Sequence, residues 1–362
     1  MSKDGDPRFD CYAILDELYR TESLVQPSAA ANRWHFLWRD LQTRSAQEPD
    51  RSTLLDLGLL SQLPSDLRSG SWRDQESELV KGRARKTPAD VILMTVIEVE
   101  FNSALAAFGV NQREATIKWI FGHPFVRIET LTRDAGELIV WVCMIGVARN
   151  LPCTNFCRDV FEQFDVRYGC ILVGIAAGHP DKLRRGDVVG ARLIYDIEGE
   201  RVEEEGGSPR LVPYPMQPPW DETFRGFNPH RWDWLAARTS ALEVLSKSGS
   251  PAPAVARARH PKYRDGIVLA GEKLRRDNPL PQLSTRFGDE IVALEMEGSG
   301  FAAACRRKQI PWFVFRGVSD HGTRRKGDTW QPVAALNAAI AARSFIENWL
   351  YRPDDGGKEI PL

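Results

Sequence analysis

Acidic residues follow three apolar segments of the chain, at the points where those segments end. They are Glu98 and Glu100 after VILMTVI (91–97), Glu295 and Glu297 after EIVAL (290–294), and Asp320 after PWFVFRGVS (311–319). Each carboxylate on its own is typical of a solvated side chain or a helix N-cap. If the segments are strands of one sheet, the carboxylates converge on a crevice, where burial and mutual repulsion raise one pKa while others stay ionised. The pattern therefore predicts acid–base chemistry near neutral pH.

A run of small residues is the second feature that could carry chemistry. The segment VGIAAGHPDKLRRGDVV (173–189) begins as an apolar strand and continues into Gly174, two alanines and Gly178. Side chains this small let a ligand approach the backbone closely. The run matches neither the GxGxxG dinucleotide fingerprint nor a P-loop, so a tight turn without a ligand is the alternative interpretation.

Short continuous apolar segments alternate with helical patterns from Asp90 onward. The expected strands are 91–97, 137–147, 169–177, 187–195, 266–270, 290–295 and 311–318, and the expected helices are 152–164, 230–247, 298–309 and 333–350. Such runs are typical of strands buried on both faces of a parallel sheet. They predict an α/β fold with three layers, α/β/α, around a mixed, mostly parallel, twisted central sheet. In such sheets ligands bind outside the carboxyl ends of the strands.

The chain is expected to divide into unequal parts. Residues 1–66 carry apolar side chains at helical spacing and are predicted to form a helical N-terminal module, followed by a polar linker over 67–88. The α/β domain is expected over 89–352, with a tail over 353–362. Residues 199–262 are rich in Gly, Pro and acidic side chains and interrupt the rhythm, which predicts an insertion that is either functional or loop-like.

Composition excludes several classes of protein. The 362 residues carry 48 basic and 49 acidic side chains, a formal net charge of −1, so bulk positive charge does not drive nucleic-acid binding. The N-terminus has no secretory signal pattern and the longest apolar run, about 138–148, is too short to span a membrane, which predicts a cytoplasmic protein. The six cysteines lack a zinc-type spacing, and no metal is expected.

Several motifs occur in a fixed order between about Asp90 and Leu350. They are IEVEF (97–101), GIAAG (174–178) with RRGDVV (184–189), LAGEKL (269–274), ALEMEGSG (293–300) and FRGVSD (315–320). This set resembles the nucleoside phosphorylase/nucleosidase superfamily, on the branch of 5′-methylthioadenosine/S-adenosylhomocysteine nucleosidase and AMP nucleosidase. The resemblance implies cleavage of an N-glycosidic bond, no organic cofactor and a homo-oligomer. The segment RRKGDTWQPVAALNAAIAA (324–342) is similar to nucleosidase-type domains of immune and signalling proteins, which implies a defence or signalling effector with a protein partner for residues 1–66.

The resemblance assigns three catalytic residues by position. Asp320 falls where the family protonates or hydrogen-bonds purine N7, a role that requires a proton near neutral pH and therefore burial. Glu297 would bind the ribose hydroxyls and stabilise the oxocarbenium-like sugar electrostatically. Glu100 falls where nucleosidases keep the Glu that orients and deprotonates water, and Glu98 is the competing choice.

The same motifs place further residues in the substrate pocket. These are Ile97, Ile175, Ala176, Ala177, Gly178, Leu274, Met296, Arg316 and Ser319. Met296 would pack on the sugar face, with ordinary core filling as the alternative. Arg316 would line the pocket, and its alternative is a buried ion pair with Glu295 or Glu297.

The chain departs from the family pattern at two points. Ile175 and Ala176 stand where the family's glycine loop usually carries Ser, and no clear set of phosphate-binding arginines follows the first strand, which favours water over phosphate as the nucleophile. Leu274 replaces the aromatic residue that stacks on the purine. Either core packing or stacking on the base is expected for aromatic residues of the insertion, which are Trp220, Phe224, Phe227 and Trp232.

Two basic clusters bear on the choice of substrate. Lys273 and Arg275 follow LAGE, and Arg324 and Lys326 follow VSD. They form either a solvated basic surface or contacts to the 5′-phosphate of a nucleotide through charge-assisted hydrogen bonds. The second interpretation favours an adenine nucleotide such as AMP or ATP over a nucleoside. A purine nucleoside phosphorylase and a non-catalytic nucleotide-sensing module are the two alternative functions.

Overall fold

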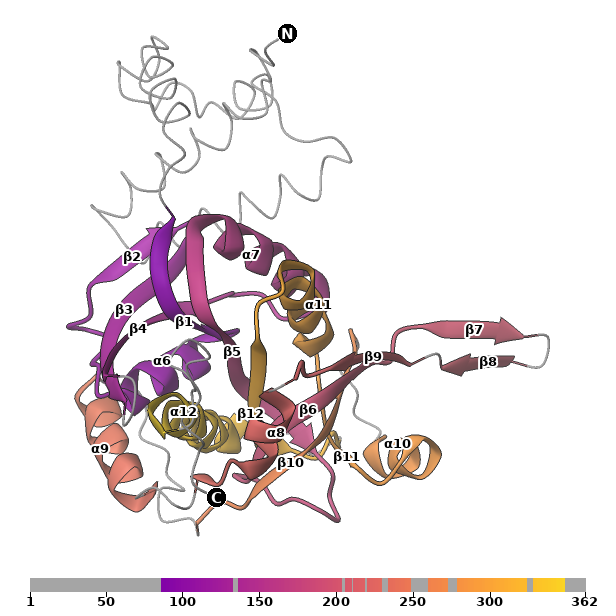
Figure 1. Ribbon diagram of the computed structural model, residues 1–362. Helices are drawn as coiled ribbons and strands as arrows, with labels where there is room; N and C mark the ends of the chain where they lie inside the picture. The colour runs from indigo at the N-terminus through magenta and orange to yellow at the C-terminus, as the bar shows by residue number, and fades with distance from the viewer. Residues whose placement is uncertain are drawn as a thin grey trace, which may run out of the picture. The chain divides into compact units, whose positions relative to one another are not determined.

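The computed structural model describes much of the chain from Lys86 to Asn348 (Figure 1). The described segments are 86–132, 136–203, 206–209, 211–218, 220–229, 234–248, 260–272, 279–323 and 328–348. The chain divides into two compact units, 1–85 and 86–362, and every described residue belongs to the second. The predicted module 1–66, the linker up to residue 85 and the tail 353–362 lie outside the described residues.

A mixed sheet of ten strands forms the centre of the unit. In chain order its strands are β1 (Thr87–Thr95), β2 (Ile117–Ile120), β3 (His123–Thr132), β4 (Gly136–Met144), β5 (Phe164–Gly178), β6 (Val188–Asp196), β9 (Val212–Pro215), β10 (Tyr263–Ala270), β11 (Ile291–Glu295) and β12 (Trp312–Asp320). Neighbouring strands β4, β1, β5 and β12 run parallel, and β12 is buried along its whole length, as its continuous apolar run predicts. The edge β2–β3–β4 is antiparallel.

One end of the sheet closes on itself. β5, β12, β6, β10 and β11 are each hydrogen-bonded to the next, and β11 returns to pair with β5 in the antiparallel direction. Ala293 and Leu294 on β11 lie opposite Gly178 and Ala177 on β5. This closure places the end of β11 beside the end of β5. Glu295 is the last residue of β11, and Glu297 follows two residues later.

Helices cover the sheet on two sides (Figure 1). They are α6 (Glu98–Ala107), α7 (Asn150–Gln163), α8 (Trp220–Gly226), α9 (Trp234–Lys247), α10 (Leu280–Phe287), α11 (Gly298–Lys308) and α12 (Gln331–Asn348). α6, α9 and α12 contact one another, and α7 contacts α11. The predicted three-layer fold around a mixed sheet is confirmed. Among the helices of the described segments, none combines the length and apolar character that crossing a lipid bilayer requires.

The predicted insertion has structure of its own. It contains the two-stranded hairpin of β7 (Glu200–Glu203) and β8 (Gly206–Pro209), which projects beyond β9 in Figure 1, as well as α8 and α9. Trp220, Phe224 and Phe227 are buried against an aromatic cluster built on Phe313 and Phe345. These three residues therefore pack in the core, and the hypothesis that they stack on a purine is wrong for them.

Candidate active site

Glu100 lies in the first turn of α6, directly after β1. The residue is only 2% exposed. Its Oε2 accepts hydrogen bonds from the backbone N–H groups of Val96 (2.8 Å) and Ile97 (3.1 Å), and Oε1 accepts one from Ile175 on β5 (2.9 Å). Burial raises the pKa of Glu100, although Arg316 and these backbone donors lower it. The carboxyl group thus joins the end of β1 to the end of β5.

Glu295 and Glu297 lie where β11 leads into α11. The carboxylate of Glu295 accepts hydrogen bonds from the backbone N–H groups of Glu297 (3.0 Å) and Gly298 (2.9 Å). Oε1 of Glu297 accepts a hydrogen bond from the backbone N–H of Arg149, 3.0 Å away. Both acids are buried, at 4% and 5% exposure. Glu295 therefore fixes the turn, and Glu297 reaches across to the loop before α7.

Arg316 on β12 holds these carboxylates together. Its guanidinium is completely buried, and Nη2 donates to Glu295 and, at 3.1 Å, to Oε2 of Glu297. Burial lowers the pKa of Arg316, but Glu295, Glu297 and Glu100 outweigh that effect and raise it. Burial raises the pKa of Glu297 to about 7; Arg316 opposes the rise, and the other two carboxylates add to it. Three carboxylates thus lie around one guanidinium, and Glu297 among them is only partly ionised near neutral pH.

Gly174 leaves the room in which this network assembles. A Cβ at Gly174 would overlap Nη1 of Arg316 and lie 2.5 Å from Oε1 of Glu100. Within the described residues, Nη1 and Nε of Arg316 have no hydrogen-bond partner. The segment 174–178 is the end of β5, because it pairs with β12 and β11. The strand expected over 169–177 is therefore confirmed, and the alternative of a tight turn at these residues is wrong. Its small residues admit neighbouring side chains as well as any ligand.

Asp320 is the last residue of β12 and is 7% exposed. Its Oδ1 accepts a hydrogen bond from the backbone N–H of Gly322 (2.7 Å), and Oδ2 accepts one from the hydroxyl of Ser319 (2.9 Å). The register shifts between Val318 and Asp320, a bulge of the kind that re-aims a side chain. At about 3.3 Å per residue, Asp320 lies roughly 13 Å along the strand from Arg316. The acids thus form a network of three and a separate fourth carboxyl.

A loop that the sequence did not single out connects the parts of the network. The backbone N–H groups of Ile145 and Gly146 each donate to a carbonyl of the β1–α6 connection, at Thr95 and Val96 (both 2.8 Å). A few residues later, the N–H of Arg149 reaches Glu297. The loop 145–149 therefore contacts the connection that holds Glu100 as well as Glu297 itself.

Comparison with known proteins identifies the family. The sequence model of the phosphorylase superfamily matches residues 115–347. The chain belongs to this superfamily. The family predicted from the motifs is confirmed.

Individual members of this superfamily are similar to the chain at low sequence identity. The ATP nucleosidase Cap17 of Escherichia coli is 25% identical over 318 residues, which cover 86% of this chain and 59% of that protein. This chain therefore spans less than two thirds of that relative. The 5′-methylthioadenosine/S-adenosylhomocysteine nucleosidase of Mycobacterium bovis is 27% identical over 189 residues, covering 50% of this chain and 71% of the relative. The solved structure of such a nucleosidase from Helicobacter pylori, with butyl-thio-DADMe-Immucillin-A, aligns with a TM-score of 0.49 and 15% identity over 72% of this chain and 98% of that one.

Other predicted site residues have varied positions. Ile97 and Met296 are half-buried beside Glu100 and Glu297, whereas Glu98 is exposed. The carbonyl of Ala176 lies 3.4 Å from the hydroxyl of Ser319 and is an alternative acceptor to Asp320 for its proton. Residues that lie outside the described segments are Lys273, Leu274, Arg275, Arg324, Lys326 and Trp232. Asp320 does not begin a helix, because the next described α-helix, α12, starts at Gln331.

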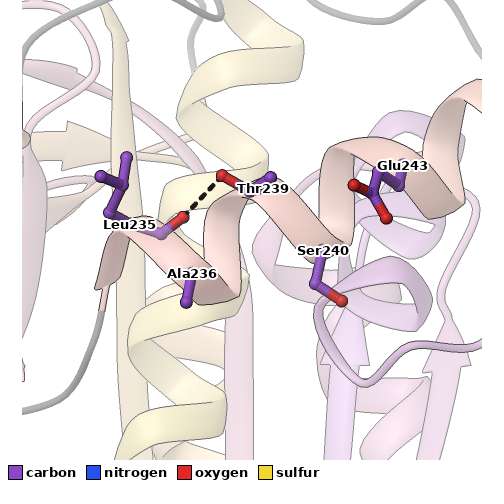
Figure 2. A pocket seen from close by; sticks show the side chains of 5 residues that line it. All are labelled: Leu235, Ala236, Thr239, Ser240 and Glu243. Carbon is purple, nitrogen blue, oxygen red and sulfur yellow. Dashed lines mark hydrogen bonds between the residues drawn. The ribbon is translucent and has the colours of Figure 1, made fainter.

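Two cavities of the described structure contain none of these residues. One, of about 460 Å³, is lined by α9 alone among the described residues, namely by Leu235, Ala236, Thr239, Ser240 and Glu243 (Figure 2). There the hydroxyl of Thr239 donates to the carbonyl of Leu235 within the same helix, at 2.9 Å. The other, of about 280 Å³, lies beside β6 and includes Arg192 and Glu290. Among the described residues no group of three or more His, Cys, Asp or Glu side chains is placed to hold a metal ion.

Proposed function

We propose that this chain hydrolyses the N-glycosidic bond of a purine nucleoside or nucleotide. The observation that carries the proposal is the convergence of Glu100 and Glu297 on the buried Arg316, where β5 ends, in a member of the phosphorylase superfamily. Buried carboxyl groups with raised pKa values in one cluster are characteristic of catalytic sites.

The negative charge of the carboxylate network suits the positive charge that the sugar develops during the reaction. In its ionised form Glu297 accepts hydrogen bonds from ribose hydroxyls and stabilises the positive charge that develops on the sugar as the bond to the base breaks. Because its pKa is about 7, Glu297 is substantially ionised only at and above neutral pH. Arg316 keeps part of that charge in place, since it lowers the pKa of Glu297.

Water is the nucleophile that fits Glu100 and Arg316. Oε1 of Glu100 and Nη1 of Arg316 flank Gly174 and offer an acceptor and a donor side by side. A water bound there would transfer a proton to Glu100 while its oxygen forms the new bond to C1′ of the ribose. The electron pair of the broken bond passes to the purine, and Asp320 gives the proton that N7 accepts. Asp320 lies on the same strand as Arg316, four residues further along β12.

An adenine nucleotide is the proposed substrate class. Support comes from the relative named as an ATP nucleosidase, and the relatives named as 5′-methylthioadenosine/S-adenosylhomocysteine nucleosidases support adenine as the base. We further propose a cytoplasmic homo-oligomer whose residues 1–66 bind a protein partner, acting as a defence or signalling effector. These additions rest on the motifs of the sequence.

Free base released from a panel of substrates tests the proposal. AMP, ATP, adenosine and 5′-methylthioadenosine are incubated with the full chain, with and without inorganic phosphate, and the products are separated by chromatography. Hydrolysis predicts adenine and the free sugar or sugar phosphate in both conditions. Product that requires phosphate would show a phosphorylase instead. Binding without any product would show a sensor.

A further inference from the structure

Arg149, the residue before α7, has a backbone conformation that only glycine adopts readily. Its φ is +111° and its ψ is +159°. For a residue with a Cβ this region is strained, and such strain persists where the surrounding structure enforces it, often at ligand-binding sites. Glycine would take the same conformation without strain. An arginine at this position therefore costs stability, and the cost calls for a role of its side chain.

The strained backbone places Arg149 next to the acids. Its N–H donates to Oε1 of Glu297 at 3.0 Å, and the N–H of Asn150 donates to Glu272 at 3.0 Å. The side chain of Arg149 is exposed, in contrast to the buried Arg316. A long cationic side chain thus starts within one backbone hydrogen bond of Glu297 and is free to reach a ligand bound there.

The negative charge of the carboxylate network explains why an anionic ligand would need Arg149. Glu100, Glu295 and Glu297 share the single guanidinium of Arg316, so an anion that approaches the network meets an excess of negative charge. A second guanidinium offsets that repulsion and offers charge-assisted, bidentate hydrogen bonds to phosphate oxygens.

We propose that Arg149 determines specificity by binding a phosphate group of the substrate, so that the enzyme prefers nucleotides over nucleosides. This inference rests on the proposed function. The proposed phosphate is part of the nucleotide. The alternative is that free inorganic phosphate binds at the same place, and the experiment distinguishes the two.

Three variants of the full chain test the role of the side chain. Arg149→Gly keeps the N–H and the backbone conformation but removes the guanidinium, and Arg149→Lys keeps a positive charge without the planar fork. Arg158→Ala on α7 removes an arginine that is 62% exposed and pairs with its neighbour Asp159, and serves as the control. The kcat/KM for base release and the calorimetric Kd are measured for AMP and for adenosine, with and without inorganic phosphate.

The expected result is that Arg149→Gly discriminates less between AMP and adenosine. In Arg149→Gly the AMP-to-adenosine ratio of kcat/KM and the corresponding ratio of affinities fall about 10- to 100-fold, the effect of removing a hydrogen bond to a charged group. Arg149→Lys restores part of that ratio, and Arg158→Ala does not change it. An unchanged ratio in Arg149→Gly overturns the inference, as does a loss confined to phosphate-dependent product. If the wild type binds AMP but releases no base, the affinity ratio alone decides the inference while the proposed function fails. If it binds neither compound, both fail.

Discussion

Two buried regions of this domain are rich in titratable side chains, and they differ in what surrounds those side chains. The first is the carboxylate network of Glu100, Glu295 and Glu297 around Arg316. The second is a cysteine cluster, defined as five free, buried cysteines on β4, α7, β5 and α11, which are Cys143, Cys153, Cys157, Cys170 and Cys305. Burial is the largest influence on pKa in both regions, and it favours the neutral form of an acid.

The difference between the regions lies in their hydrogen bonds. Cys157 contacts the sulfur of Met94 at 3.7 Å, and Cys143 contacts the carbonyl oxygen of Leu93 at the same distance. Burial raises the pKa values of Cys143, Cys157 and Cys305 well above the usual range, so these three thiols act as small apolar side chains. The carboxylates instead accept N–H donors from strand ends and share a guanidinium. Burial alone therefore does not produce a candidate active site. Burial combined with donors that support a charge does.

Removal of the two proposed proton-transfer groups is expected to have the largest effect. Glu100→Gln and Asp320→Asn keep the size of each side chain but remove the proton acceptor and the proton donor, so base release from AMP falls about 10²- to 10⁴-fold for each variant. Chromatography of free adenine measures the effect, and circular dichroism verifies the fold. Near-wild-type rates in a folded Glu100→Gln variant would show that another group activates the water.

Loss of the shared guanidinium is expected to destabilise the domain strongly. Arg316→Met leaves Glu295 and Glu297 without their buried counter-charge, which costs about 3–5 kcal/mol of unfolding free energy. Arg225→Met removes an arginine that is 56% exposed and pairs with Asp221 on the surface, and should change the unfolding free energy far less. Urea denaturation measures both. Equal losses of unfolding free energy in Arg316→Met and Arg225→Met would contradict the account of the network.

Neutralising Glu297 is expected to stabilise the protein in a pH-dependent way. Its folded pKa of about 7 exceeds the ordinary value of 4.5, so the folded state binds more protons than the unfolded state between these values, and stability falls as pH rises through that window. Glu297→Gln mimics the protonated form and should gain up to roughly 3 kcal/mol at pH 8 but nothing near pH 4. Thermal denaturation across this range checks the trend.

Glu295→Gln is the matched control for that experiment. Both acids accept hydrogen bonds at both oxygens, but Glu295 accepts from two backbone N–H groups as well as from Arg316, whereas Glu297 accepts from one. An amide therefore leaves more buried donors without an acceptor at Glu295. This variant should therefore lose about 1–3 kcal/mol at pH 8. A gain in stability at pH 8 for Glu295→Gln, or a loss of stability for Glu297→Gln, would reverse the roles given to the two acids.

Substitution in the cysteine cluster is expected to have the smallest effect. Cys157→Ala removes one sulfur from a packed core and should cost about 1–2 kcal/mol, with base release within about twofold of wild type. The five cysteines of the cluster should also resist thiol reagents in the native protein, since they are buried. A large loss of activity in a stable Cys157→Ala variant would give the cluster a role in the site.

The layers of the fold could be predicted from the sequence because the strands of the parallel core are apolar along most of their length. The strand predicted at 311–318 is β12, and the helix predicted at 333–350 is α12. β2 and β3 were missed because polar and apolar residues mix in both of these antiparallel strands. β2 has no fully buried side chain, and β3 combines buried and exposed ones. The closure of β11 on β5 depends on pairing between distant segments, which local patterns do not encode.

The candidate site was predicted only in part. Glu100, Glu297 and Arg316 were identified by their motifs, and the structure brings them together. Arg149 was missed, because a positive φ in a residue other than glycine leaves no mark in the sequence. The glycines of 174–178 left a tight turn open as an alternative to the strand expected over 169–177, whereas Gly174 lies in β5 and admits the guanidinium and a carboxylate. A small residue in a strand can thus indicate a neighbouring side chain.

Base release by Glu297→Gln at pH 8 tests the central claim most directly, because at that pH the variant should be at least as stable as the wild type. The account predicts a folded, more thermostable protein. Its release of adenine from AMP should be at least about 10²-fold slower than that of the wild type, since the charge that stabilises the sugar is gone. A stable Glu297→Gln variant that releases adenine at the wild-type rate would contradict it.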